Sequence, residues 1–215
     1  HPSFGTAVIA RWLQKHGYRV AVVPQPNWRD DLRDFRKLGA PRLYFGVNSG
    51  AMDSMVNHYT AAKRLRSDDA YTPEGKAGQR PDYAVTVYTK ILKQIYPDIP
   101  VIIGGIEASL RRVTHYDYWQ DALKPSILVE SGADWLCYGM GERTMIEFTR
   151  AIESGRNLND IRKIPQLGFY MDGRCRTKDA VILNSYERCC KDKVAFAENF
   201  HVVETYANMQ NPPVL

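Results

Sequence analysis

The sequence lacks four features, and each absence excludes a class of protein. No apolar run approaches the roughly 20 residues that a membrane-spanning helix needs. No secretory signal is visible, and no G-x-G-x-x-G fingerprint for dinucleotides follows an apolar run. Cysteine is scarce, and its spacing matches no zinc or iron–sulfur motif, the positions being Cys137, Cys175, Cys189 and Cys190. We therefore expect a cytoplasmic protein with no membrane partner and no metal site in this chain.

The overall composition is that of an ordinary globular protein. Apolar residues make up 44% and charged residues 25% of the 215 positions. This length suffices for one α/β domain with an extra element or a small second domain. The net charge of +5 favours anionic partners such as phosphates or nucleic acid, although positive and negative charges alternate along the chain as on a solvated surface.

Predicted strands and helices alternate along most of the chain. Short apolar runs predict strands at 18–23, 42–47, 101–103 and 134–138. Periodic apolar residues predict helices at 6–16, 30–38, 83–96, 106–112 and 143–154, with Gly17 ending the first. This alternation predicts an α/β fold with three layers and a mostly parallel sheet, flavodoxin-like or cobalamin-domain-like.

The last fifty residues follow a different pattern. Residues 166–171 and 174–183 flank Asp172-Gly173, a favourable hairpin turn. The segment 187–209 predicts one long helix with a single buried face, formed by Phe196, Phe200, Val203 and Ala207. We therefore expect the α/β domain to be followed by a β-hairpin and a long C-terminal helix.

The stretch 47–60 combines the features of a ligand site. Asn48-Ser49-Gly50 ends the predicted strand 42–47, and a helix follows whose apolar stripe is Met52, Met55, Val56 and Tyr59. Polar side chains four residues apart occupy other faces, namely the pairs Asp53 with Asn57 and Ser54 with His58. Ligands of α/β proteins bind at such strand-to-helix turns. The same sequence pattern would also occur in an ordinary strand-to-helix junction with a solvated helix face.

Two more predicted strands end in glycine turns, at Gly104-Gly105 and Gly139-Met140-Gly141. The carboxyl ends of parallel strands share one edge of the sheet, so the three turns should meet around one cavity. The candidate cofactor-binding residues are Asn48, Ser49, Asp53, Asn57, His58, Gly104, Gly105, Glu107, Gly139, Gly141 and Glu142. The alternative is that these residues cap helices and satisfy turns.

The polar segment 63–82 is unusually long for a loop in a compact domain. It carries the cations Lys63, Arg64, Arg66, Lys76 and Arg80. It is either a basic lid over an anionic ligand or a solvated insertion.

Several stretches together resemble the YgiQ-type family of radical SAM proteins. They are HPSFGTAVIARWL, GVNSGAMDSMVNHYTAAKRLRSDDAYTP, KAGQRPD, VIIGGIEASLRR, HYDYW and YGMGE. The resemblance implies a cobalamin-binding-like domain over 1–164, preceded by a strand upstream of His1. It implies that 165–215 lead towards a radical SAM barrel, the expected partner, which holds a 4Fe-4S cluster on C-x-x-x-C-x-x-C and cleaves S-adenosylmethionine. The substrate and the catalytic residues stay unknown.

The chain departs from the family pattern in two places. It has no C-x-x-x-C-x-x-C, so the cluster is expected outside it and this chain alone is expected to be inactive. Base-off cobalamin domains carry D-x-H-x-x-G, whereas here Gly5 stands one residue too far from His1. Cobalamin, if bound, is therefore expected without His1 on cobalt, although Gly104-Gly105 matches the glycine pair near the nucleotide tail.

The resulting functional prediction is an accessory domain of a radical SAM enzyme that faces substrate or cofactor. One alternative is an independent flavodoxin-like enzyme with acid/base groups among Asp53, His58, Glu107 and His115, which turnover by the isolated chain would reveal. The other is a nucleic-acid-binding module that uses the basic loop with Tyr71 and Tyr83. Strongly salt-dependent binding would favour that module.

Overall fold

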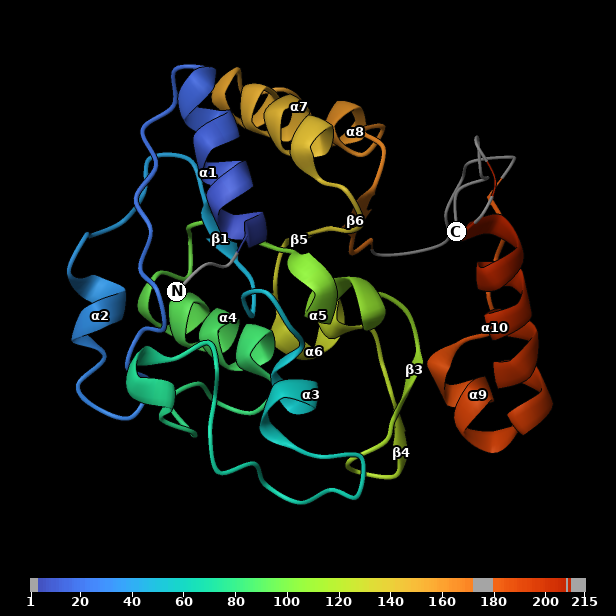
Figure 1. Ribbon diagram of the computed structural model, residues 1–215. Coiled ribbons are helices and arrows are strands. Elements are labelled where there is room, and N and C mark those ends of the chain that lie inside the picture. Colours follow the sequence, from blue (N-terminus) through green and yellow to red (C-terminus); the bar gives the residue numbers. More distant parts are fainter. Residues whose placement is uncertain (1–3, 172–179, 208, 210–215) are drawn as a thin grey trace. The chain divides into compact units, whose positions relative to one another are not determined.

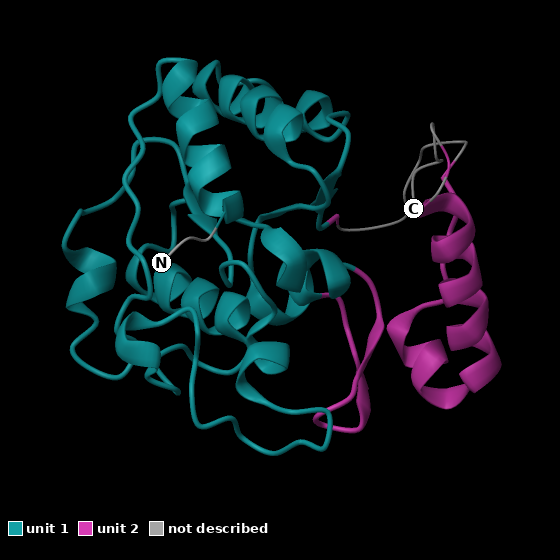
Figure 2. Ribbon diagram, viewed as in Figure 1, with its two compact units in different colours: residues 1–112, 127–170 teal, residues 113–126, 171–215 magenta. Residues whose placement is uncertain are grey.

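The computed structural model describes residues 4–171, 180–207 and 209 (Figure 1). They fall into two compact units, which Figure 2 colours separately. The first comprises the described part of 1–112 together with 127–170, and the second comprises 113–126 and the described part of 171–215. The division into domains 1–164 and 165–215 stays a prediction.

The first unit is built on a four-stranded, mostly parallel sheet, which confirms the predicted α/β class. Its strands are β1 (Phe45–Val47), β2 (Val101–Ile103), β5 (Trp135–Cys137) and β6 (Leu167–Phe169), in the spatial order β1-β2-β5-β6. The first three are parallel, with Gly46 opposite Ile102 and Ile103 opposite Leu136. Only β6 runs antiparallel to its neighbour, β5.

Apolar residues pack on both faces of this sheet because successive side chains of a strand point to opposite sides. Val101 and Ile103 belong to a cluster with residues of α4 (Ala84–Ile95) and α6 (Ile127–Ser131). Ile102, between them, belongs to a second cluster with residues of α7 (Glu142–Glu153) and α8 (Leu158–Ile161). Figure 1 shows α1 (Phe4–Lys15) beside α7. Because one apolar cluster covers each face of the sheet, the continuous apolar run of β2 is buried on both sides.

Most predicted helices are present. The predictions at 6–16, 83–96 and 143–154 are confirmed as α1, α4 and α7. Gly17, just past α1, has a φ of 89°, a conformation that glycine adopts without steric cost and that commonly ends helices. The helices α2 (Arg33–Arg36) and α5 (Gly105–Leu110) are shorter than the predicted 30–38 and 106–112. No helix among the described residues is both long and apolar enough to cross a membrane.

The predicted strand at 18–23 is wrong. The segment is irregular, and Val22 is 52% exposed. Valine-rich composition favours extended backbone, but a strand also needs a neighbour with which to exchange backbone hydrogen bonds. No such neighbour pairs with 18–23 among the described residues.

The apolar stripe predicted after Gly50 is confirmed only for Met55, which is 3% exposed. The helix there, α3 (Ser54–His58), is short, and it leaves Val56 46% exposed. Its buried residues include Ser54, Asn57 and His58. The polar face is turned inward because distant polar groups bond to it, as described below.

The second unit corrects the prediction for the tail. Residues 172–179, which include the predicted hairpin turn, lie outside the described residues; 180–183 are not in a strand, and 167–169 pair with β5. An antiparallel hairpin is formed by other residues, β3 (His115–Asp117) and β4 (Ala122–Lys124).

The predicted long helix of the tail is two helices, α9 (Tyr186–Lys191) and α10 (Lys193–Ala207). Asp192 breaks the run because its backbone is extended, at φ −136° and ψ 106°. Phe200, predicted to be buried, is 64% exposed. The buried residues of α10 are Ala195 and Asn199, and Asn199 hydrogen-bonds the backbone of Asn184.

Candidate functional site

The three glycine turns lie at one edge of the sheet, as predicted, because β1, β2 and β5 are parallel. A Cβ atom added to Gly105 would lie 3.2 Å from the Cβ of Asn48, in the turn after β1. One added to Gly104 would lie 3.2 Å from the carbonyl oxygen of Cys137, the last residue of β5. The turns are therefore in close contact, and side chains larger than hydrogen would separate them.

The third turn is equally tight. A Cβ atom on Gly141 would lie 2.8 Å from the Sγ of Cys137, and one on Gly139 would lie 2.8 Å from the Nε2 of Gln166. The backbone N–H of Gly139 donates to the hydroxyl of Ser109, on α5. Glu142 follows as the first residue of α7. The glycines of this turn thus meet a packing requirement, and ligand binding by Gly139, Gly141 and Glu142 stays a prediction.

Asp53 and Arg111 form a buried ion pair at the start of α3. Asp53 also caps this helix, because one of its carboxylate oxygens accepts the backbone N–H groups of Met55 and Val56 at 3.0 and 3.2 Å. Arg111 follows α5, 58 positions further along the chain. Arg111 is not among the predicted site residues, because nothing in the local sequence pattern distinguishes this arginine from the exposed ones.

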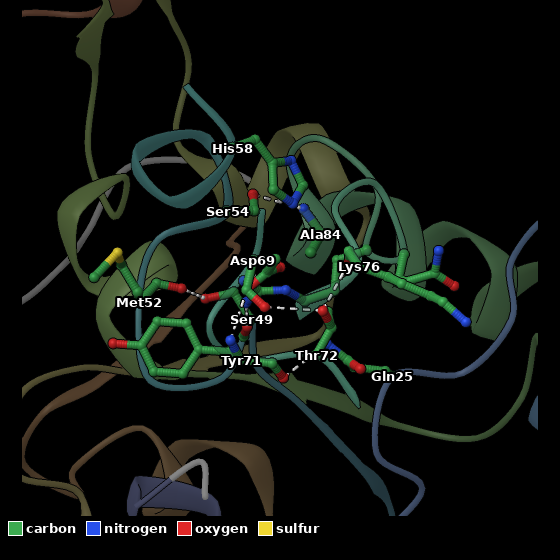
Figure 3. Close-up of polar contacts among 12 residues, drawn as sticks. Gln25, Ser49, Met52, Ser54, His58, Asp69, Tyr71, Thr72, Lys76 and Ala84 are labelled. Atoms are coloured by element: carbon green, nitrogen blue, oxygen red, sulfur yellow. Dashed lines mark hydrogen bonds and ion pairs between the residues drawn. The ribbon is translucent and has the colours of Figure 1, made fainter. Parts of the chain in front are cut away.

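Glu107 is fully buried and joins three helices. One of its carboxylate oxygens accepts the N–H of Ser54 at 2.8 Å, and the other accepts the N–H of Val85 at 2.9 Å. The hydroxyl of Ser54 accepts the N–H of Ala84 at 3.1 Å (Figure 3). The N–H groups at the starts of α3 and α4 are therefore paired with the side chains of Glu107 and Ser54. Capping helices in this way is the structural alternative to ligand binding that the sequence left open for these residues.

Asn48 and Ser49 hold the turn between β1 and α3. The side-chain oxygen of Asn48 accepts the N–H of Gly50 at 2.9 Å and the hydroxyl of Thr6 at 3.1 Å. The hydroxyl of Ser49 donates to the carbonyl of Met52 at 2.9 Å (Figure 3). Both side chains therefore have structural partners, and a cofactor contact by either stays a prediction.

The predicted loop 63–82 contains no α-helix and no strand, as expected, but it is anchored to this turn. Arg80 donates to the carbonyl of Ser49 at 2.8 Å and forms a 3.0 Å ion pair with Asp69. Both charged side chains are almost completely buried, 4% and 1% exposed. Arg80 therefore does not belong to the exposed basic surface that a lid would use. The other four cations of the loop are exposed, namely Lys63, Arg64, Arg66 and Lys76.

Asp69 organises the tip of the segment. It accepts the N–H of Tyr71, and the hydroxyl of Thr72 lies 2.9 and 2.7 Å from the carbonyls of Asp69 and Lys76 (Figure 3). A 3-10 turn, η1 (Pro73–Gly75), closes the tip. Burial opposes ionisation of Asp69, but hydrogen bonds from the N–H of Tyr71 and from Arg80 outweigh it and hold the pKa of Asp69 below its ordinary value.

His58 and Asp82 form a hydrogen-bonded pair at the other end of α3. The Nδ1 of His58 lies 2.7 Å from one Asp82 oxygen, and the hydroxyl of Tyr59 donates to the other at 2.7 Å. This hydrogen bond raises the pKa of Tyr59. Of the predicted site residues, Asn57 and His58 line a cavity together with residues of the segment 63–82.

The described residues do not fit a four-iron cluster. They contain no group of three or more His, Cys, Asp or Glu side chains that could hold a metal ion. Cys137 is buried, which raises the pKa of its thiol to about 11, so it is poorly suited to act as a thiolate ligand. His115, the remaining acid/base candidate, lies on β3 in the second unit, with its Nδ1 3.1 Å from the carbonyl of Val113.

Comparison with known proteins places the chain in a family. The model of the radical SAM N-terminal family matches residues 1–215. A UPF0313 protein of Porphyromonas gingivalis is 56% identical over 212 residues, which cover 97% of this chain and 33% of the relative. For UPF0313 proteins of Bacteroides thetaiotaomicron and Geobacter sulfurreducens the identities are 53% and 47%, covering 97% and 99% of this chain and 36% and 34% of the relatives. No solved structure matches.

The chain thus spans about a third of the length of the curated relatives that it matches. It belongs to the radical SAM N-terminal family, as its resemblance to the YgiQ-type proteins predicted.

Proposed function

We propose that this chain is the N-terminal accessory region of a YgiQ-type radical SAM enzyme and that it faces the substrate or a cofactor. The observation that supports this most directly is the family match over the whole chain. The family implies a 4Fe-4S cluster and S-adenosylmethionine for the full-length protein. Because the described cysteines do not fit a cluster, we assign the 4Fe-4S cluster and the S-adenosylmethionine site to the part of the full-length protein that corresponds to the unmatched two thirds of the relatives.

The carboxyl edge of the sheet supports a contact with that remaining part. Ile106 and Leu110 lie one turn apart on α5 and are 45% and 57% exposed. Met140, in the third glycine turn, is 78% exposed. Exposed apolar side chains around a predicted ligand edge are typical of an interaction surface. We infer that the downstream radical SAM barrel packs against this edge.

We further infer a three-layer, flavodoxin-like or cobalamin-domain-like fold for the complete domain. The two separate apolar clusters on the faces of the sheet support this. The tight Gly104-Gly105 turn is compatible with close approach of a nucleotide tail, so cobalamin is a candidate ligand. His1, the residue considered for cobalt, lies outside the described residues.

The proposal is tested by comparing the full-length protein with residues 1–215 expressed alone. Both are reconstituted anaerobically with iron and sulfide, and we measure bound iron and, with dithionite as electron donor, 5′-deoxyadenosine release from S-adenosylmethionine. We expect a cluster and cleavage only in the full-length protein. A cluster or turnover in the isolated chain would overturn the accessory role, and strongly salt-dependent RNA binding would favour the nucleic-acid module instead.

The contact with the barrel is tested with substitutions on the exposed edge. We expect the variant carrying Ile106→Asp and Met140→Asp to weaken association between residues 1–215 and the separately expressed remainder. Leu65→Asp is the control, because Leu65 is 66% exposed but lies in the segment 63–82. Equal association of both variants would contradict the proposed surface.

A further inference from the structure

Strand β1 forms an open edge of the sheet. The N–H of Phe45 donates to the carbonyl of Pro100 at 2.9 Å. The carbonyl of Val47 accepts the N–H of Gly104, also at 2.9 Å, so Phe45 and Val47 both face β2. Because successive residues of a strand direct their backbone groups to opposite neighbours, those of Gly46 point to the other side. Among the described residues no strand pairs with that side.

The composition of β1 is that of an interior strand. Edge strands of natural proteins commonly carry charged residues or proline, which keep other strands from pairing with them. The sequence of β1, Phe-Gly-Val, contains neither. Gly46 is nevertheless exposed, whereas Val47 beside it is buried. The open side of β1 is therefore suited to accept another strand.

A second segment also lacks a neighbour on this side of the sheet. Residues 18–23, YRVAVV, have the composition of a strand, yet no strand among the described residues pairs with them. Figure 1 shows this segment, the blue trace between α1 and α2, on the side of β1 that is away from β5. An open edge and a strand-like segment without a partner thus occur together.

The hand of the connections gives the order of these elements. Crossovers between parallel strands are almost always right-handed, so connections on one face of a sheet all advance in one direction, and those on the other face advance in the opposite direction. The connection from β1 to β2 runs over α4. The connection from 18–23 to β1 runs over α2 on the same face, because the rings of Phe35 and Tyr88 pack 5.8 Å apart in one cluster. As a parallel strand, 18–23 therefore lies beyond the open side of β1.

Helix α1 covers the opposite face, where Ile9 packs against the cluster that contains residues of α7. A connection over α1 therefore advances in the opposite direction, so the strand that leads into α1 belongs between 18–23 and β1. Thr6, in the first turn of α1, donates its hydroxyl to the side chain of Asn48 at 3.1 Å. Asn48 directly follows β1, so the chain enters α1 at the carboxyl end of β1, as the continuation of a strand parallel to it.

We propose that the segment preceding His1 in the full-length protein forms a parallel strand that inserts between β1 and 18–23. It pairs with the open side of β1, and 18–23 pairs with its other side. Because helices cover both faces of this sheet, the inserted strand is a continuous apolar run. The pairing requires neither the cluster nor radical chemistry.

The inserted strand also selects one part of the predicted ligand edge, and this consequence rests on the proposed function. The connection after the inserted strand runs over α1, and the connection after β1 runs over α4, on opposite faces of the sheet. Open α/β sheets bind ligands at such a reversal, outside the carboxyl ends of the strands. Asn48 and Ser49 lie at this point, whereas the third glycine turn follows β5, further along the sheet.

Hydrogen–deuterium exchange of the full-length protein tests the proposal. It is compared with the same protein lacking the residues before His1, using peptides that contain 18–23 or 101–103. We expect the amides of 18–23 to be protected in the full-length protein and to exchange like unstructured chain after the truncation. The peptide with 101–103 is the control, because β2 keeps β1 and β5 as neighbours and should stay protected.

Three results would overturn the proposal. The amides of 18–23 could exchange freely in the full-length protein, or their protection could survive the truncation, which would show that the downstream part covers the edge. Protection that falls when the full-length protein is diluted would identify a second copy of the chain as the partner. Protected 18–23 in a full-length protein that cleaves no S-adenosylmethionine would instead refute the proposed function and leave the inserted strand intact.

Proline substitutions in the full-length protein decide the case in which the truncated protein unfolds altogether. Proline donates no backbone hydrogen bond, and an edge strand tolerates it only where the N–H would face outward. Inward and outward N–H groups alternate along such a strand. We therefore expect the melting temperature of Ala21→Pro to differ from those of Val20→Pro and Val22→Pro, after correction with Val20→Ala and Val22→Ala. Equal corrected values for all three would refute the paired strand.

Discussion

Replacing Glu107 by Gln tests whether the buried carboxylate has a structural role. The carboxylate of Glu107 is fully buried and accepts two backbone N–H groups, from Ser54 and Val85. Glutamine has nearly the same shape but only one acceptor oxygen. Its amide nitrogen would face one of these N–H groups, donor against donor, and leave that group without an acceptor.

The size of the effect follows from the contacts. A hydrogen bond to a charged group contributes about 1.5–3 kcal/mol, and a buried unsatisfied donor costs about 1–3 kcal/mol. One bond is lost and the other is weakened by removal of the charge. We therefore expect Glu107→Gln to lower the free energy of unfolding by about 2–4 kcal/mol.

Urea unfolding followed by circular dichroism measures this difference, with Glu147→Gln as the control. Glu147 loses the same charge on α7, but its partner Arg143 is at the surface, so the unfolding free energy should hardly change. If both variants unfold at the same urea concentration, Glu107 does not stabilise the junction. Its carboxylate would then be available for the ligand role that the sequence suggested.

Three further predictions concern Asp69, Cys137 and the glycine turns. The pKa of Asp69 is lowered in the folded protein, so its contribution to stability is present above about pH 4, the unfolded pKa, and is lost as the pH falls through the folded pKa. Asp69→Asn should therefore reduce the loss of stability at acid pH measured by urea unfolding, and an unchanged pH dependence would contradict this. Iodoacetamide at pH 8 should alkylate exposed Cys190 well before Cys137, whose pKa is raised to about 11 by burial, and mass spectrometry showing equal rates would be the contrary result. Gly105→Ala should destabilise the protein by about 1–2 kcal/mol or more, because φ is 80° there. In calorimetry Gly5→Ala should instead stabilise α1 by about 0.5–1 kcal/mol, and the opposite order would count against the tight turn.

Sequence alone determined those features that depend on local pattern. The apolar runs at 101–103 and 134–138 are strands in which every residue from Val101 to Ile103 and from Trp135 to Cys137 is buried. The helices α1, α4 and α7 follow from their apolar periodicity. The parallel direction of the strands also follows from the alternation, and it placed the three glycine turns at one edge.

Only the tertiary structure decided which groups find partners far along the chain. The segment 18–23 has a strand-like composition but no neighbouring strand. On α3 the polar side is buried because its partners are remote: Glu107 reaches Ser54 across 53 positions, and Arg111 reaches Asp53 across 58. A buried polar group is stable only with such a partner, and no local pattern encodes one. The same physics separates His58, whose Nε2 has no protein partner, from Asp53 and Glu107, whose acceptors are used within the fold.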